Sequence, residues 1–163
     1  MRLNDNVSMR TTFLILAILI SGITGTRAQQ RYIPLKEFQG DTVRYMIVNF
    51  VENKNRYIGQ KVDSLFKDLE FEITTSFTSD CNHLDKYKIN GLKFSHHNDR
   101  QQMELYKKGE GYYLLNIRFA PPYTATKTLD KWSQIKGVYW NKERRDFMKD
   151  YIIKDIELVS YND

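Results

Sequence analysis

The run from Gly111 to Phe119 constrains the fold most, because its residues alternate without interruption. One set of alternate positions is apolar or aromatic, and it consists of Tyr113, Leu115, Ile117 and Phe119. The other set consists of Tyr112, Leu114, Asn116 and Arg118. A period of two is typical of a β-strand with one buried face. We therefore expect the rest of the chain to pack on this strand or to extend its sheet.

The residues just before this run predict a partner strand. Residues 102–107 also alternate, with Met103 and Leu105 on the apolar side. Between the two runs lie Gly109 and Gly111, and glycine readily supplies the positive φ that a tight hairpin turn needs. The pattern predicts a β-hairpin over residues 101–119.

Hydrophobic spacing predicts further elements on both sides of this hairpin. Asp41 is a candidate helix cap before apolar residues at helical spacing over 43–51, and a second short helix follows Gly59. Helices are also expected over 128–136 and after Asn141. A period of two or a β-branched composition predicts strands over 71–77, 92–97 and 152–161. Helices ahead of an antiparallel sheet of about 4–5 strands, closed by a C-terminal helix and strand, indicate the α+β class.

The N-terminus has the parts of a secretory signal peptide. Arg10 precedes an uncharged stretch, and the unbroken apolar core of that stretch, residues 13–20, is too short to cross a membrane stably. Small residues then precede Ala28, as they do at a signal-peptidase site. A buried N-terminal helix is the alternative interpretation of the same residues.

Cleavage after Ala28 would define the exported product. We expect residues 1–28 to be the signal peptide, with Met9 as an alternative start, and residues 29–163 to form a single α+β domain. The junction Ala28-Gln29-Gln30 resembles those of small exported proteins from Bacteroidetes-like bacteria. This resemblance covers only the leader and implies no activity. The expected location is periplasmic or secreted.

Composition argues against several classes of protein. Cys81 is the only cysteine, so an internal disulfide is excluded and a core-stabilised domain is expected. Without the leader, 22 basic and 19 acidic residues remain, and they are evenly spread. This weak positive charge argues against nucleic-acid binding. No second long apolar run follows the leader, so no transmembrane segment is expected in the mature protein.

The histidines are the candidates for metal chemistry. His83, His96 and Asp99 carry ligand types that suit zinc, and a metal-assisted hydrolase would use such a set. If His96 and His97 lie on a strand, however, they point to opposite faces, and one ion cannot easily bind both. A hydrogen-bonded histidine in the core is the ordinary alternative for His96.

Signatures of covalent catalysis are missing from the sequence. Ser95 or Cys81 could act with a histidine, but no Gly-x-Ser-x-Gly turn or cysteine-protease signature is present. The carboxylates sit in no recognisable motif, and no pattern calls for a cofactor. The sequence thus favours binding over catalysis.

Aromatic residues are the candidates for ligand binding, since 21 of the 135 residues after the leader are Phe, Tyr or Trp. The rings that crowd the second half of the chain are Tyr112, Tyr123, Trp132, Tyr139 and Trp140. Flat rings with a polar edge suit sugar and peptide surfaces. Aromatic residues also favour half-buried sheets, which is the structural alternative.

Taken together, these patterns predict a small exported protein that acts as a non-catalytic binding module of the bacterial periplasm or cell envelope. Its partner would be an extracytoplasmic protein, a peptide or a glycan. Two other functions stay open: a secreted hydrolase, in a metal-assisted form or not, and an inhibitor of a secreted enzyme. An inhibitor would present a protruding loop, for which residues 78–90 and 120–128 are candidates.

Overall fold

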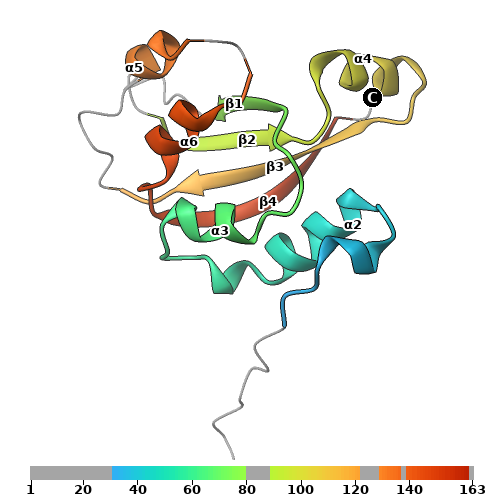
Figure 1. Cartoon of the computed structure of the whole chain (residues 1–163), viewed down its shortest axis with the longest axis horizontal. Helices are drawn as coiled ribbons and strands as arrows, with labels where there is room; N and C mark the ends of the chain where they lie inside the picture. The colour runs from blue at the N-terminus through green and yellow to red at the C-terminus, as the bar shows by residue number, and fades with distance from the viewer. Residues whose placement is uncertain (1–30, 80–88, 122–128, 137–138, 162–163) are drawn as a thin grey trace, which may run out of the picture. The chain divides into compact units, whose positions relative to one another are not determined.

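Four antiparallel strands form the framework of the fold (Figure 1). The computed structural model describes residues 31–79, 89–121, 129–136 and 139–161. The strands lie side by side in chain order, as β1 (Thr75–Ser79), β2 (Gly91–Ser95), β3 (Tyr112–Phe119) and β4 (Ile153–Tyr161). Helices precede this sheet, and a helix and a strand close it. The predicted α+β class is confirmed.

β3 buries the face that its alternating sequence predicted. Leu115 and Ile117 are fully buried, and Phe119 is almost so. Across the β2–β3 ladder, Phe94 lies opposite Leu115, and Leu92 lies opposite Ile117. Residues directly opposite one another share a face of the sheet, so these apolar side chains make one continuous surface for the helices.

The helical elements before the sheet pack on this surface. They are η1 (Leu35–Phe38), α2 (Thr42–Met46), its π-helical continuation η2 (Ile47–Glu52), η3 (Lys54–Arg56) and α3 (Val62–Asp68). As predicted, Asp41 caps α2, because its carboxylate accepts a hydrogen bond from the Arg44 backbone N–H at 2.9 Å. The Phe66 ring of α3 lies 6.3 Å from the Phe94 ring of β2, which joins the two layers.

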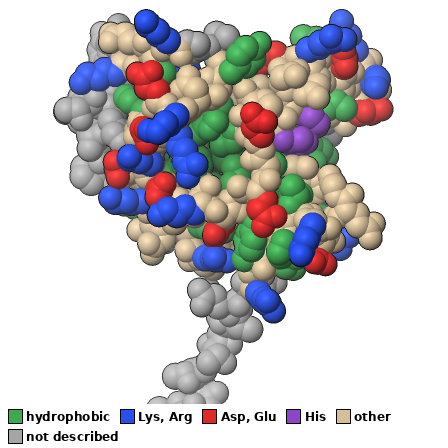
Figure 2. All heavy atoms as spheres, in the orientation of Figure 1, with side chains coloured by type: hydrophobic (Ala, Val, Ile, Leu, Met, Phe, Trp, Pro, Cys, Tyr) green, Lys and Arg blue, Asp and Glu red, His purple; other side chains and the backbone are tan. Residues whose placement is uncertain are grey.

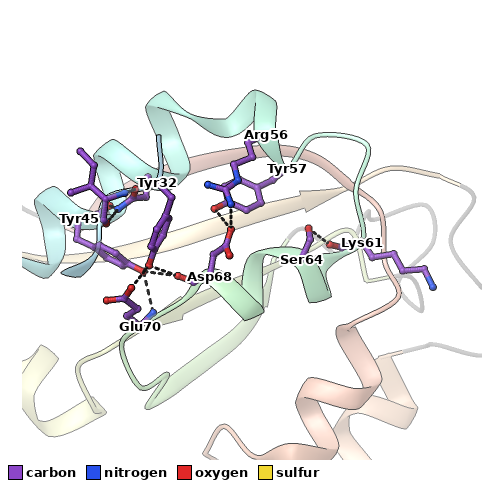
Figure 3. A network of polar contacts seen from close by, with 10 residues as sticks. Tyr32, Tyr45, Arg56, Tyr57, Lys61, Ser64, Asp68 and Glu70 are labelled. Atoms are coloured by element: carbon purple, nitrogen blue, oxygen red, sulfur yellow. Dashed lines mark hydrogen bonds and ion pairs between the residues drawn. The ribbon is translucent and has the colours of Figure 1, made fainter. Parts of the chain in front are cut away.

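A network of hydrogen bonds fastens the residues before α2 to the end of α3 (Figure 3). The Tyr32 hydroxyl lies 2.9 Å from the Tyr45 hydroxyl, 2.6 Å from the Asp68 carbonyl oxygen and 2.8 Å from the Glu70 carboxylate. Arg56 adds an ion pair with the Asp68 carboxylate at 3.0 Å. Burial, and then the hydrogen bonds to Tyr45 and Glu70, raise the pKa of Tyr32. The phenol therefore stays neutral and serves to hold the chain together.

Residues Asp99–Lys107 form helix α4, so the predicted hairpin is wrong. Asn98 and Gln101 make a capping box, in which each side chain accepts a hydrogen bond from the backbone N–H of the other at 2.9 Å. At the other end, the Gly109 and Glu110 N–H groups donate to carbonyls of the last turn, a Schellman motif. Gly109 has the positive φ that was predicted, but it ends a helix instead of turning a hairpin.

β1 and β2 are shorter than predicted. β1 begins at Thr75. Just before it, the Thr74 N–H donates to the Ser95 carbonyl in a hydrogen bond that lies outside the regular ladder. From there Ser76 pairs with Phe94 and takes the core face. Phe77, the last residue of the predicted strand over 71–77, points away from the core and is 46% exposed. The irregular backbone before β1 thus shifts the phase of the alternation.

The C-terminal excursion forms α5 (Leu129–Gln134) and α6 (Lys142–Met148) before the chain enters β4. Asn141 caps α6 as predicted, because its side chain accepts a hydrogen bond from the Arg144 N–H at 2.9 Å. Met148 is fully buried, and the Val62 N–H of α3 donates to the Tyr151 carbonyl at 2.9 Å. Within the described ranges, no helix has the length and apolar character needed to span a bilayer.

Candidate binding groove

Two adjoining pockets follow the outer side of β1. The first, of about 400 Å³, is lined by residues 72–74 and 98–100 together with Tyr139 and Trp140. The second, of about 390 Å³, is lined by residues 75–78 and by Asp99, Trp132, Tyr139 and Arg144. Asp99 and Tyr139 belong to both pockets, so the two are parts of one depression. We call it the edge groove.

The wall of the edge groove is a sheet edge. Among the described strands, β1 pairs only with β2. In an antiparallel pair, alternate residues direct their N–H and C=O groups away from the partner strand, so part of the β1 backbone faces outward. Edges are commonly blunted by charged residues or proline, yet the sequence of β1 is Thr75-Ser-Phe-Thr-Ser79. Within the described residues, β1 therefore carries neither of these features.

Ser76 places a buried polar group at the groove. The residue is only 7% exposed, and its hydroxyl has no hydrogen-bond partner among the described residues. It lines the second pocket beside Phe77 and Thr78. A buried polar group without a partner costs about 1–3 kcal/mol. A ligand in the pocket could supply the missing partner.

Three of the five predicted aromatic residues meet in this groove, namely Trp132, Tyr139 and Trp140. Tyr139 is the most accessible, at 58% exposed. Trp132 is buried, with the Arg144 guanidinium 4.4 Å from its ring centre. Trp140 is half-buried, and its ring packs edge-on against Phe66 at 5.3 Å. Tyr139 is thus the ring free to contact a ligand, and the two indoles form supporting walls.

The other two predicted rings do not join this group in the described structure. Tyr112 stacks on Tyr161 across the β3–β4 pair, with ring centres 5.1 Å apart and an interplanar angle of 8°. Neither ring lines the edge groove. Tyr123 lies outside the described residues. The predicted ligand-binding role of Tyr112 and Tyr123 stays a prediction.

Charge in the first pocket is predominantly negative. Glu72 and Asp99 pair with no lysine or arginine in the described parts of the chain. Arg100 also lines this pocket, but its guanidinium is held by Glu104 at 2.9 Å. The Asp99 carboxylate instead lies 3.4 Å from the Thr75 hydroxyl of β1. Two carboxylates thus remain available to a ligand.

His96 and His97 follow the end of β2, and their rings lie 3.8 Å apart between centres. Because β2 stops at Ser95, the two histidines do not lie on a strand, and the condition under which their rings would point to opposite faces is not met. Burial, and then the charge of His97, lower the pKa of His96 to about 4, and burial also lowers the pKa of His97. The Ser95 hydroxyl accepts a hydrogen bond from the His97 backbone N–H at 3.0 Å.

The predicted metal set is only partly visible. No group of three or more His, Cys, Asp or Glu side chains in the described ranges could hold a metal ion. His96 packs edge-on against the Phe71 ring at 5.8 Å, whereas Asp99 lines the edge groove. His83 and Cys81 lie outside the described residues.

The surface around these elements is mixed in character. Figure 2 shows apolar side chains that reach the surface in the middle of one face, with a group of Lys and Arg side chains on the left, further basic side chains at the right, and histidine to the right of the apolar side chains. The exposed apolar residues include Phe77 and Tyr139 of the edge groove and Met103 of α4.

The sequence did not reveal the most important wall of the groove, which is β1. Two signals in the sequence could have identified it. Residues 75–79 contain no charge or proline, and Asn98 is a candidate cap for a helix that begins with Asp99. Arg144 is a further residue that the sequence did not single out, and it is buried over Trp132.

Comparison with known proteins was made at the level of families, sequences and structures. No protein-family model matches the chain, and no curated protein and no solved structure match it significantly.

Proposed function

We propose that this protein is a non-catalytic binding module that captures an extended peptide by adding it as a fifth strand beside β1. The observation that carries this proposal is the edge of β1, which among the described strands pairs only with β2, carries no charged residue or proline, and lies beside a groove with aromatic walls. In strand addition, main-chain hydrogen bonds supply affinity, and pockets for alternate side chains supply specificity. The edge groove offers both features.

Ser76 offers a contact in addition to the main-chain hydrogen bonds of an added strand. Its buried hydroxyl lacks a partner among the described residues, and a polar side chain of the peptide that points to the same face of the sheet would provide one. The main-chain hydrogen bonds to the edge of β1 supply the rest of the affinity. A new hydrogen bond of this kind contributes about 0.5–1.5 kcal/mol, and a short added strand makes several. After the costs of association and ordering, we expect dissociation constants on the order of 10–100 μM.

The proposal includes export. It is supported by the order of features at the N-terminus: Arg10, the apolar core over residues 13–20, and small residues before Ala28. N-terminal sequencing of the protein recovered outside the cytoplasm of an expressing bacterium is expected to begin at Gln29. A folded cytosolic product that retains residues 11–28 would contradict export without affecting the proposal for the groove.

Binding can be measured through the protein's own tryptophans. The chain has two, Trp132 and Trp140, and both line the edge groove. The probes are blocked peptides of the form acetyl-Thr-Val-Thr-Xaa-Thr-Val-Thr-amide, in which Xaa is varied over the ordinary amino acids. We expect at least one member of the series to change the tryptophan fluorescence with a dissociation constant below about 1 mM.

An N-methyl scan of the best probe then tests the geometry. An added strand directs alternate N–H groups toward β1, so methylation should weaken binding at every second position only. The variant Phe77→Lys places a charge at the groove and should weaken binding roughly tenfold, as charged residues do at natural edges. The matched control Met103→Lys changes an apolar side chain of α4 that is 54% exposed, and it should have no effect. Penalties without alternation, or no binding in the whole series, would contradict strand addition.

A further inference from the structure

We infer that the first pocket of the edge groove binds a lysine or arginine side chain of the captured peptide. This inference rests on the proposed function and specifies the class of peptide. It follows from the unpaired carboxylates, the aromatic rings and the position of this pocket beside the start of β1.

The carboxylates come from two separate segments. Glu72 lies just before β1, and Asp99 begins α4, where the capping box of Asn98 and Gln101 fixes the backbone. Both line the pocket, and neither pairs with a basic residue in the described ranges. A cation between two carboxylates gains favourable electrostatic energy from both, and the gain is larger where the site is partly shielded from water.

The aromatic residues suit the same guest. Tyr139 and Trp140 line the pocket together with the carboxylates. An ammonium or guanidinium group near the face of Tyr or Trp gains about 0.5–2 kcal/mol from the ring quadrupole. The long apolar stem of lysine or arginine can pack against the rings while its charged end reaches the carboxylates.

The positive charges near the groove do not oppose this assignment in the first pocket. Arg100 is the only basic residue among those that line it, and Glu104 holds its guanidinium at 2.9 Å. Arg144 lines the second pocket and lies 4.4 Å over the Trp132 ring. The second pocket thus carries one basic and one acidic side chain, Arg144 and Asp99, and we expect it to favour an uncharged side chain. The two pockets thus distinguish neighbouring positions of one peptide.

The test compares three members of the same probe series, in which Xaa is lysine, norleucine or glutamate. Norleucine keeps the length of the stem and removes the charge. We expect lysine to bind at least roughly tenfold more tightly than norleucine, and glutamate to bind most weakly. The advantage of lysine should shrink when salt is raised from about 50 mM to about 500 mM, whereas binding of norleucine should hardly change.

Variants of the protein locate the effect. Glu72→Gln and Asp99→Asn remove one charge each with little change of shape, and each should reduce the preference for lysine about threefold to tenfold. Glu37→Gln removes a carboxylate from η1, outside the groove, and is the matched control. Binding of the norleucine probe should be the same in all of these proteins, which shows that the groove remains folded.

The outcomes separate the inference from the proposed function. If lysine, norleucine and glutamate bind equally and the N-methyl scan still alternates, strand addition stands and the cation pocket is wrong. If lysine is preferred but Glu37→Gln removes the preference as fully as Asp99→Asn does, the effect comes from the net charge of the protein and the inference is again wrong. If no probe binds, both proposals fail together.

Discussion

The ring centres of His96 and His97 lie 3.8 Å apart, although these residues are adjacent in the sequence. This arrangement exists because β2 ends at Ser95 and the chain bends through the pair. Both Nδ1 atoms are buried without a hydrogen-bond partner among the described residues. Two protonated imidazoles at this separation would repel one another, and a buried charge would also lose hydration.

The histidine pair should make the fold sensitive to mild acid. The pKa of His96 is lowered from 6.5 to about 4, so the unfolded chain binds more protons than the folded protein between these values. The free energy of unfolding should therefore rise with pH across this window, by at most about 3 kcal/mol. Urea unfolding of wild type and His96→Gln at about pH 5 and about pH 7 measures it. A pH difference as large in the variant as in wild type would show that other groups are responsible.

Replacing Ser76 should separate stability from binding. Ser76→Ala removes a buried hydroxyl without a described partner, so we expect the free energy of unfolding to rise by up to about 1–2 kcal/mol. Ser79→Ala is a matched control, because its hydroxyl is also buried and without a described partner but lines neither pocket. Only Ser76→Ala should weaken binding of the lysine probe. Equal binding by the two variants would remove Ser76 from the site.

Elements whose local signals agree could be predicted from the sequence. The alternation over residues 112–119 and the caps at Asp41 and Asn141 each indicated a structure that packing also favours. Residues 102–107 were different, since Met103 and Leu105 fit a short strand as well as a helix. The deciding signal was the spacing Asn98-x-x-Gln101, which forms a capping box. Met103 is 54% exposed, so the apolar alternation over residues 102–107 does not mark a buried face.

The groove was harder to predict because it depends on tertiary contacts. Trp132, Tyr139 and Trp140 are close in the sequence, so their meeting could be partly expected. That they face β1 could not, because this contact depends on how α5, α6 and the residues between them pack beside the sheet. The face that Ser76 presents also depends on the irregular backbone at Thr74, which a strict period of two cannot describe.

Gly91 should tolerate no side chain. A Cβ at this position would lie 2.2 Å from the Ser79 hydroxyl oxygen and 2.6 Å from the Ile117 carbonyl oxygen. Gly91→Ala should therefore destabilise the protein by about 3 kcal/mol, the upper end for overpacking. Adding Ser79→Ala relieves the first contact but leaves the carbonyl of β3 in place, so thermal unfolding should show only partial recovery. Full recovery in the double variant would mean that β2 and β3 can move apart easily.

Asp155 joins three elements through charge. Its carboxylate pairs with Lys54 of η3 at 2.8 Å and with Arg118 of β3, and the Lys54 hydrogen bond is the main cause that lowers its pKa to about 2. A carboxylate whose pKa is lowered by folding stabilises the fold at pH values above its ordinary pKa of 3.8. This contribution is lost as the pH falls toward 2. Because the basic partners are partly exposed, we expect Asp155→Asn to cost about 1 kcal/mol at neutral pH. The cost should shrink strongly as the pH falls to about 2 in denaturant unfolding, and a constant cost at both pH values would assign it to packing.

The capping box of α4 should affect both the stability of the protein and the preference of the edge groove for a lysine side chain. Asn98→Ala removes the acceptor for the Gln101 N–H, which should destabilise the protein by about 0.5–2 kcal/mol. Because Asp99 is the next residue, the first pocket should also lose its fixed carboxylate, and the preference for the lysine probe over norleucine should fall. Asn98→Ser keeps a capping acceptor without adding charge to the pocket and should retain the preference. Asn141→Ala is the matched control, since it removes the cap of α6 but leaves α4 intact. If Asn98→Ala lowers stability and leaves the lysine preference unchanged, the position of Asp99 does not depend on the cap.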